Sequence, residues 1–316
     1  MTSALILTAG LGTRLDPITR LVAKGAVPLG DDTLIERAIA WLRAEGVRDV
    51  VLNLHHRPES IAAVVGDGVH LGVRARYSWE APILGSAGGP RRALPLVATD
   101  PILIVNGDTL CSLPLAPMIE AHARTGADVT MAVVRNPAPD QYNGIVMDDE
   151  RRIQGFVPRG QAHGTWHFIG VQIAQASVFS ELADGVPAET VSGIYRDFVE
   201  SGSRRLFAWP VTLPFIDVGT PEDYLRAALS LRTATAGAES VIVPGASVDP
   251  SARLTDSLVW ADARISANAG LDECIVAGPV DVPAGFTAKR AVLMPASVVR
   301  EGDRASIKNG VATFEL

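Results

Sequence analysis

The sequence has little of what builds metal clusters, disulfide frameworks or nucleic-acid surfaces. Its 316 residues include two cysteines, Cys111 and Cys274, whose wide separation gives neither a metal-binding spacing nor a disulfide framework. No lysine- or arginine-rich block accompanies the net charge of -7, which argues against nucleic acid or an anionic membrane as a partner. No apolar run approaches a membrane span and no charged leader stands at the start, so a cytoplasmic protein with reduced thiols is expected.

Aromatic residues are also scarce, at 5% within a hydrophobic fraction of 47%, so Ala, Val, Leu and Ile must form the core. Apolar runs at 4–8, 50–54 and 73–77 alternate with helical patterns at 33–44 and 61–65. This order of elements implies right-handed crossovers. We therefore predict an α/β fold with a Rossmann-like, mainly parallel mixed sheet.

A glycine loop follows the first apolar run. Residues 9–24 read AGLGTRLDPITRLVAK, in which Gly10 and Gly12 allow the backbone to approach a ligand closely. Backbone N–H groups in such a loop can wrap a phosphate chain. Arg14 and Lys24 would add positive charge, which phosphoryl transfer requires. A common structural turn is the alternative interpretation of two glycines alone.

Two other phosphate loops are excluded. Leu15 stands where the dinucleotide fingerprint has its third glycine, which disfavours an NAD-dependent dehydrogenase. The glycine-lysine-serine/threonine ending of the ATPase loop is absent as well. What remains, a G-x-G-x-R-L-x-P-x-T pattern followed by a lysine, is far more specific than a pair of glycines.

This pattern resembles the signature of the sugar-1-phosphate nucleotidyltransferases, most closely the mannose-1-phosphate guanylyltransferase-like and N-acetylmuramate-1-phosphate uridylyltransferase-like members. The resemblance implies a reaction between an NTP and a sugar 1-phosphate that yields an NDP-sugar and pyrophosphate, with Mg²⁺ as cofactor. Arg14 and Lys24 would be catalytic. The nucleotide would contact Ala9, Gly10, Gly12 and Thr13. The family usually has proline after its lysine, whereas Gly25 follows Lys24 here.

A second glycine-rich stretch, EAPILGSAGGPRRAL at 80–94, resembles the family's E-x-P-L-G-T-A-G element, which holds the nucleobase. Carried over, Glu80, Gly85 and Gly88 would line the base pocket. A carboxylate accepts hydrogen bonds, and guanine offers two adjacent donors, so GTP with mannose 1-phosphate is the expected substrate pair. UTP or dTTP is the alternative, and a simple packing turn is the competing interpretation of the glycines.

Two aspartates are the candidate metal ligands. Asp108 ends the apolar run 102–105, a position where α/β sheets place their ligands, and resembles the metal-binding aspartate of the family's V-x-G-D element. Asp217 opens the element DVGTPEDY, in which Thr220 is expected to cap the next helix. Two carboxylates from distant parts of a sequence can hold an octahedral Mg²⁺.

The sugar phosphate would lie against a predicted antiparallel insertion over 142–157 and the strand after it. The resemblance implies that four residues contact it: Asn106, Gly144, Arg159 and Gly170. Arg159 stands where the family has a phosphate-binding lysine, and its guanidinium can bind phosphate through a bidentate fork. Because Gly25 and Arg159 both depart from the family pattern, a non-catalytic regulatory relative that binds nucleotide sugars is a further alternative.

We predict a catalytic domain at 1–232 and a second region at 233–316. The second region contains a linker, which spans about 232–238, and a C-terminal tail. In the tail, small or apolar residues recur about every six positions, including Val248, Val259, Ile265 and Val280, which predicts a left-handed parallel β-helix. All histidines precede the tail, so a second, acetyltransferase-like activity is disfavoured. The tail is expected to be a lid, a packing platform or a homo-oligomer contact. Because the repeats are confined to the tail, a protein that is only a repeat scaffold is disfavoured.

Overall fold

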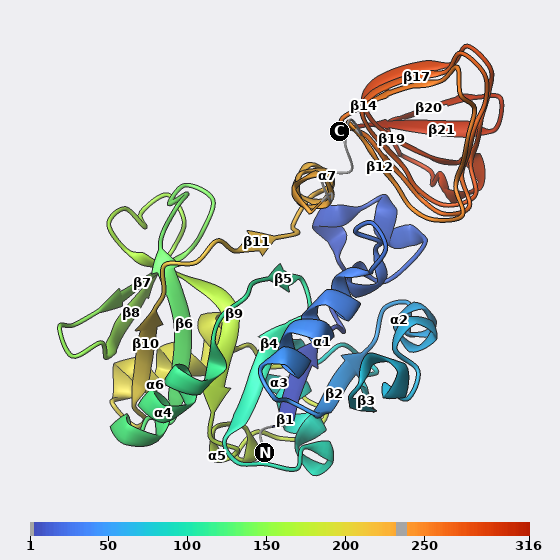
Figure 1. Ribbon diagram of the computed structural model, residues 1–316. Helices are drawn as coiled ribbons and strands as arrows, with labels where there is room; N and C mark the ends of the chain where they lie inside the picture. Colours follow the sequence, from blue (N-terminus) through green and yellow to red (C-terminus); the bar gives the residue numbers. More distant parts are fainter. Residues whose placement is uncertain (1–2, 232–238) are drawn as a thin grey trace. The chain divides into compact units, whose positions relative to one another are not determined.

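The computed structural model describes residues 3–231 and 239–316, which form two compact units (Figure 1). The first unit contains Met1–Gly10 and Ile35–Asp217. The second contains Leu11–Leu34 and Val218–Leu316. Most of the glycine loop at 9–24, called the signature loop from here on, therefore belongs with the C-terminal tail. The predicted linker at 232–238, and with it the predicted boundary after 232, lies outside the described residues.

The first unit is built on a mixed sheet in the order β3-β2-β1-β4-β9-β6-β10. Neighbours among the first four strands are parallel, as are β6 and β10, whereas β9 runs antiparallel to both β4 and β6. These pairings confirm the predicted mainly parallel mixed sheet. The strands are β1 (Ser3–Leu7), β2 (Asp49–Leu54), β3 (Arg74–Trp79), β4 (Ile102–Asn106), β6 (Val129–Arg135), β9 (Trp166–Ala174) and β10 (Leu206–Pro210).

Two smaller pairings extend this unit. The antiparallel hairpin of β7 (Gly144–Met147) and β8 (Ile153–Val157) joins the sheet through β9 and confirms the predicted insertion. β5 (Thr109–Leu110) and β11 (Ile216–Asp217) form a separate antiparallel ladder. This ladder joins two segments that are far apart in the sequence.

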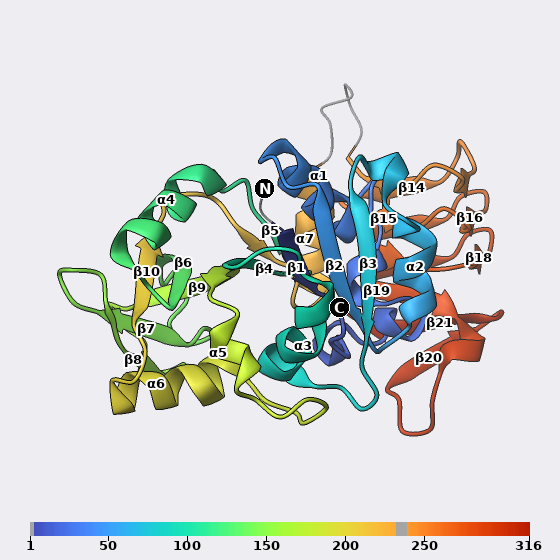
Figure 2. The same cartoon turned by 90° about the horizontal axis from the view of Figure 1, so that it is seen from below.

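Helices cover both faces of the sheet. Figure 2 shows α4 on one side of β6, β9 and β10, and α3, α5 and α6 on the other. The sequence analysis identified α1 and α2 but not α4. Within the described residues, no helix is long and apolar enough to cross a membrane. The helices are α1 (Leu34–Ala44), α2 (Pro58–Val65), α3 (Gly85–Ala93), α4 (Leu115–Thr125), α5 (Ser177–Ser180) and α6 (Tyr195–Ser201).

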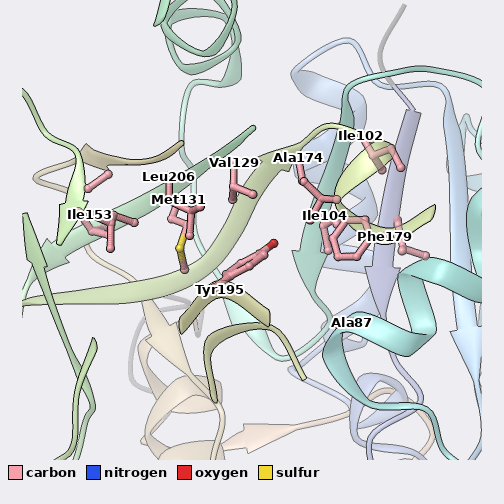
Figure 3. Close-up of a cluster of buried hydrophobic side chains, with 14 of the residues drawn as sticks. Ala87, Ile102, Ile104, Val129, Met131, Ile153, Ala174, Phe179, Tyr195 and Leu206 are labelled. Atoms are coloured by element: carbon pink, nitrogen blue, oxygen red, sulfur yellow. The ribbon is translucent and has the colours of Figure 1, made fainter. Parts of the chain in front are cut away.

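The core of the first unit is aliphatic, with a few large rings. Figure 3 shows the rings of Phe179 and Tyr195 on one face of the strands, with Ile104 and Met131 turned toward them. Tyr195 is fully buried, and its hydroxyl donates a 2.7 Å hydrogen bond to Oε1 of buried Gln172. Burial raises the pKa of Tyr195, so the hydroxyl keeps its proton and remains a donor.

The second unit contains α7 (Pro221–Ser230) and a coil of short strands. The backbone N–H of Asp223 donates to Thr220 Oγ1 at 3.2 Å, and Asp223 Oδ2 accepts from the Thr220 N–H at 3.0 Å. This capping box, with Pro221 at the first helical position, confirms the predicted helix start.

The tail repeats with a spacing of 17 residues. Val241 pairs in parallel with Leu258, which pairs with Ile275, which pairs with Val292, and side-chain bonds such as Cys274 N–H to Ser257 Oγ span the same interval. The remaining short strands also pair in parallel, so the chain climbs as a parallel coil. The strands are β12 (Val241–Ile242), β13 (Ser247–Val248), β14 (Arg253–Thr255), β15 (Leu258–Val259), β16 (Arg264–Ile265), β17 (Gly270–Val276), β18 (Asp281–Val282) and β19 (Thr287–Pro295).

The predicted inward positions pack inside this coil. Val259, Ile265 and Val280 are at most 2% exposed, and Val248 packs against the same cluster. The left-handed sense of the coil stays a prediction. An antiparallel hairpin, which the repeat pattern did not indicate, follows the coil: β20 (Ala305–Lys308) and β21 (Val311–Glu315).

We expect Tyr195→Phe to lower the free energy of unfolding by about 1–3 kcal/mol, because the buried Gln172 Oε1 loses its donor. Urea unfolding of the variant and the wild type measures the difference. Tyr77→Phe is the matched control, since the Tyr77 hydroxyl bonds to the Gly66 carbonyl at an exposed position and its loss should change stability far less. Equal stability of Tyr195→Phe and wild type would contradict this account of the core.

Candidate active site

The order of strands reverses around β1, which lies between β2 and β4. In open α/β sheets, ligands bind beyond the carboxyl ends of the strands at such a point. The chain leaves β1 through residues 8–10 and β4 through residues 106–108. Gly107 N–H donates to the Leu7 carbonyl at 3.0 Å, and a Cβ at Gly107 would lie 2.8 Å from that oxygen. Glycine is therefore required here for the two exits to run together.

Asn53, at the end of β2, connects three strand exits. Its Oδ1 accepts hydrogen bonds from the N–H groups of Thr8 at 2.6 Å and Ala9 at 3.3 Å. Its Nδ2 donates to Glu80 Oε1 at 2.7 Å. The sequence analysis missed this residue, although a polar side chain in the apolar run VVLNL was a usable signal.

Glu80 is buried rather than presented to a ligand. The residue is only 2% exposed. One carboxylate oxygen, Oε2, accepts a hydrogen bond from the Leu84 N–H at 2.8 Å. With Asn53 on the other oxygen, each carboxylate oxygen already has a protein donor. That this carboxylate pairs with both donors of guanine stays a prediction. In the structure, Glu80 anchors the turn that leads into α3.

The glycines at the start of α3 are explained by a neighbouring loop. A Cβ at Gly88 would lie 2.7 Å from the Val186 carbonyl, and the Gly88 N–H donates to the Ala188 carbonyl at 3.1 Å. Gly88 is buried, which supports the packing interpretation of this glycine, and its place in the base pocket stays a prediction. Gly85 has φ +77, and a Cβ there would lie 2.5 Å from Glu189 Oε1.

The two predicted metal ligands lie together. Asp217 pairs directly with Thr109 across the β5–β11 ladder, and Asp108 immediately precedes Thr109. The backbone of Asp108 is therefore one residue away from the partner of Asp217, although the two residues come from distant parts of the sequence. Both residues are partly exposed. No cluster of three or more potential ligands occurs in residues 3–231 and 239–316, so two carboxylates would leave the remaining positions to water and phosphate oxygens.

Asn106 and Gly170 are neighbours beside this ladder. A Cβ at Gly170, which has φ +80, would lie 2.9 Å from Asn106 Cβ and 2.7 Å from Thr109 Oγ1. The predicted sugar-phosphate residues on β4 and β9 are therefore brought together with the aspartate pair through Thr109. The absence of a side chain at 170 is what permits this approach.

Gly144 is the first residue of β7 and pairs with Val157 at the end of β8, and Arg159 follows two residues later. The Arg159 N–H donates to Asn143 Oδ1 at 3.0 Å, and its side chain is exposed. The structure thus presents this guanidinium to solvent.

Three rings, one of them just before β7, form an aromatic stack that the sequence did not indicate. The ring centroids of Tyr142 and His167 are 4.2 Å apart, and those of His167 and Phe215 are 5.6 Å apart. Burial lowers the pKa of His167, which favours the neutral ring at pH 7. The stack fixes the segment before Asp217 against β9.

Within the second unit, the signature loop folds on itself. Gly12 has φ +62, and a Cβ there would lie 2.7 Å from Thr19 Cγ2 and 3.4 Å from Lys24 Cβ. Thr19 Oγ1 also donates to the Gly12 carbonyl at 3.3 Å. Lys24 is therefore held beside the second signature glycine.

Arg14 and Thr13 are exposed, and the Arg14 guanidinium lies beside the start of α7. A Cβ at Gly219 would lie 2.8 Å from Arg14 Nη1. Gly219 follows Asp217 by two residues in the sequence. Gly10, by contrast, is exposed and has open space around its Cβ position within the described structure, so internal packing does not require a glycine there.

Two known proteins match most of the chain. The chain is 27% identical over 297 residues to the mannose-1-phosphate guanylyltransferase of Mycobacterium tuberculosis, covering 91% of this chain and 83% of that protein. It is also 27% identical over 293 residues to the UTP–glucose-1-phosphate uridylyltransferase of Synechocystis, covering 88% and 72%.

The fold matches solved structures as well. The crystal structure of HddC from Yersinia pseudotuberculosis complexed with GMP-PN aligns with a TM-score of 0.64 at 22% identity, covering 73% of this chain and all of that one. Residues 3–234 match the family model described as nucleotidyl transferase. The chain therefore belongs to the nucleotidyl transferase family, within which its relatives are sugar-1-phosphate nucleotidyltransferases.

Proposed function

We propose that this protein joins an NTP to a sugar 1-phosphate, with GTP and mannose 1-phosphate as its substrates, and releases pyrophosphate. One observation carries the proposal: the β5–β11 ladder brings Asp217 beside Asp108 at the carboxyl edge of the sheet. The family supplies the reaction class. The site supplies the carboxylates, and the signature loop supplies the cations.

The chemistry needs no general base, because the sugar 1-phosphate is already an anion. Its phosphate oxygen attacks the α-phosphorus of the NTP in line. The new P–O bond forms as the bond to the β-phosphate oxygen breaks, and pyrophosphate leaves with that electron pair. We propose that Arg14 and Lys24 stabilise the charge that develops on the α-phosphate and the leaving group.

The aspartate pair fits a magnesium ion. Asp108 and Asp217 offer hard oxygen ligands, and a site with two carboxylates leaves room for waters and phosphates. Mg²⁺ bound there would supply positive charge to the phosphate oxygens. The exposed Arg159 and the neighbouring pair of Asn106 and Gly170 are the groups we propose for the sugar phosphate.

The choice of GTP rests on the relative from Mycobacterium tuberculosis, which matches 91% of this chain. Because the carboxylate of Glu80 is occupied, we propose that backbone groups read the base. Gly10 is the best placed of these, since it is exposed and no packing demands its lack of a side chain. UTP with a glucose-type sugar 1-phosphate is the second candidate, since the relative from Synechocystis matches 88% of the chain. Pyrophosphate release with each pairing of GTP, UTP, dTTP or ATP with mannose or glucose 1-phosphate decides between them.

Asp108→Asn and Asp217→Asn should each abolish turnover while the fold persists, because an amide keeps the shape but loses the charge that binds Mg²⁺. Pyrophosphate release is measured across a Mg²⁺ titration, with circular dichroism as the check on folding. Asp281→Asn is the matched control, since the Asp281 side chain is 87% exposed on the tail. Near-normal activity of both site variants at limiting Mg²⁺ would overturn the assignment.

Glu80→Gln should destabilise the protein without changing the preferred nucleotide. The Gln amide can accept from only one of the two donors that now face the carboxylate, so we expect a loss of about 1–3 kcal/mol in unfolding free energy. The ratio of kcat/KM for GTP to that for UTP should stay within about twofold of the wild-type ratio. A large change in that ratio would restore the carboxylate as the reader of the base.

A further inference from the structure

The C-terminal tail holds the signature loop through buried charge. Arg20, which is 8% exposed, donates from Nε to Asp16 Oδ1 at 2.8 Å within the loop. The same guanidinium donates to both carboxylate oxygens of Asp303, with Nη2 3.0 Å from Oδ1, and to the Val298 carbonyl at 3.1 Å. Its carbon lies 5.4 Å from the centre of the Phe314 ring. One loop side chain therefore contacts three residues of the tail.

A second anchor lies on the other side of Lys24. The Tyr224 hydroxyl of α7 donates to the Pro28 carbonyl at 2.5 Å and accepts the indole N–H of Trp260 at 2.9 Å. Tyr224 is fully buried, and Trp260 is a residue of the coil. This chain of bonds runs from the coil through α7 to the loop.

Apolar contact supports the polar anchors. A Cβ at Gly278 of the coil would lie 2.8 Å from Leu21 Cδ1, so the missing side chain at this glycine leaves room for a loop side chain. Gly278 has φ +83, which a larger residue adopts only with strain.

The anchors lie close to the groups assigned to catalysis. Arg20 follows Thr19, which contacts Gly12, and Gly12 in turn lies beside Lys24. Lys24 is four residues from each anchor, Arg20 on one side and Pro28 on the other. A shift of either anchor therefore moves the loop that carries the lysine.

We propose that Arg20 is a positioning residue, and that the tail, through Asp303 and through Trp260 and Tyr224, holds the signature loop in its working geometry. This inference rests on the proposed function for its effect on turnover. It goes beyond that function by making the C-terminal coil a structural part of the catalytic machinery. The tail then serves as a packing platform, one of the roles expected from the sequence, with the loop as its partner.

The ionic anchor is permanent at physiological pH. The hydrogen bond from Arg20, followed by that from the Arg300 N–H, lowers the pKa of Asp303 to about 2. Because the folded-state pKa is depressed, the stabilisation is present above the ordinary carboxyl range and is lost as pH falls toward about 2. Asp16 and Arg300 are the other charged groups facing the pair. Between pH 6 and 9 the anchor should therefore not change the shape of the pH–rate profile.

The test compares Arg20→Ala, Arg20→Lys and Asp303→Ala in the full chain. We expect kcat to fall by about tenfold to a hundredfold in the alanine variants, with the KM for NTP changed less, because misplacing a catalytic group by about 1 Å has effects of this size. Arg20→Lys should recover part of the loss. The double variant Arg20→Ala/Asp303→Ala should lose no more than the worse single variant, since both remove one anchor.

Hydrogen exchange of peptides covering 11–34 is the second readout and does not depend on turnover. Exchange should accelerate in Arg20→Ala, Asp303→Ala and Tyr224→Phe. It should stay unchanged in Asp272→Asn, which breaks an exposed ion pair with Lys289 inside the tail, and in Tyr195→Phe, the matched core substitution.

The outcomes separate the two proposals. Wild-type exchange and a kcat within twofold of wild type in both alanine variants would overturn the anchoring. If exchange is faster in the alanine variants but the wild type turns over no NTP–sugar phosphate pair, the proposed function is overturned and the anchoring stands. Equally accelerated exchange of the 11–34 peptides in Asp272→Asn would also overturn the anchoring, because the effect would then be a general loosening of the tail.

Discussion

The exits of β1 and β4 are constrained to run against each other, and the site in the first unit depends on that constraint. Gly107 bonds to Leu7 and leaves no room for a Cβ. The polar groups that follow β4 therefore emerge beside the loop that follows β1. Strand order reverses at this point, which is where open α/β sheets bind their ligands.

Hydrogen bonding extends this constraint across the sheet. Asn53, within β2, binds the backbone after β1 and the carboxylate after β3, so two loops share one side chain of the strand between them. A buried amide is a costly component unless every polar atom finds a partner, and here both ends do. Glu80 belongs to the same network, which explains why a carboxylate occurs in a loop without an exposed role. The residues that look most like ligand contacts in a sequence can be the ones that shape the loop.

Much of the architecture was predictable because it follows from local patterns. Apolar runs and glycine breaks placed most strands, and the capping sequence TPED placed the start of α7. The pairing of Asp217 with Thr109 was not predictable from spacing, because long-range register depends on tertiary contacts. The family resemblance put forward Asp108 and Asp217 as metal ligands, but it did not predict this pairing. The packing of Gly88 against the loop at 182–190 and the bond between Glu80 and Asn53 were not predictable for the same reason, because these partners are distant in the sequence.

The division of the chain into two units changes how the loop at 11–34 should be understood. A glycine loop alone has little to fix it, because its apolar surface is small and its backbone is permissive. Here its arginine, its proline carbonyl and a leucine each meet a partner from the C-terminal third of the sequence. A coil with identical 17-residue turns is a stiff support for such contacts, since each turn is paired to the next along its strands. Rigidity that the loop cannot generate from its own residues is supplied by a segment that carries no catalytic group.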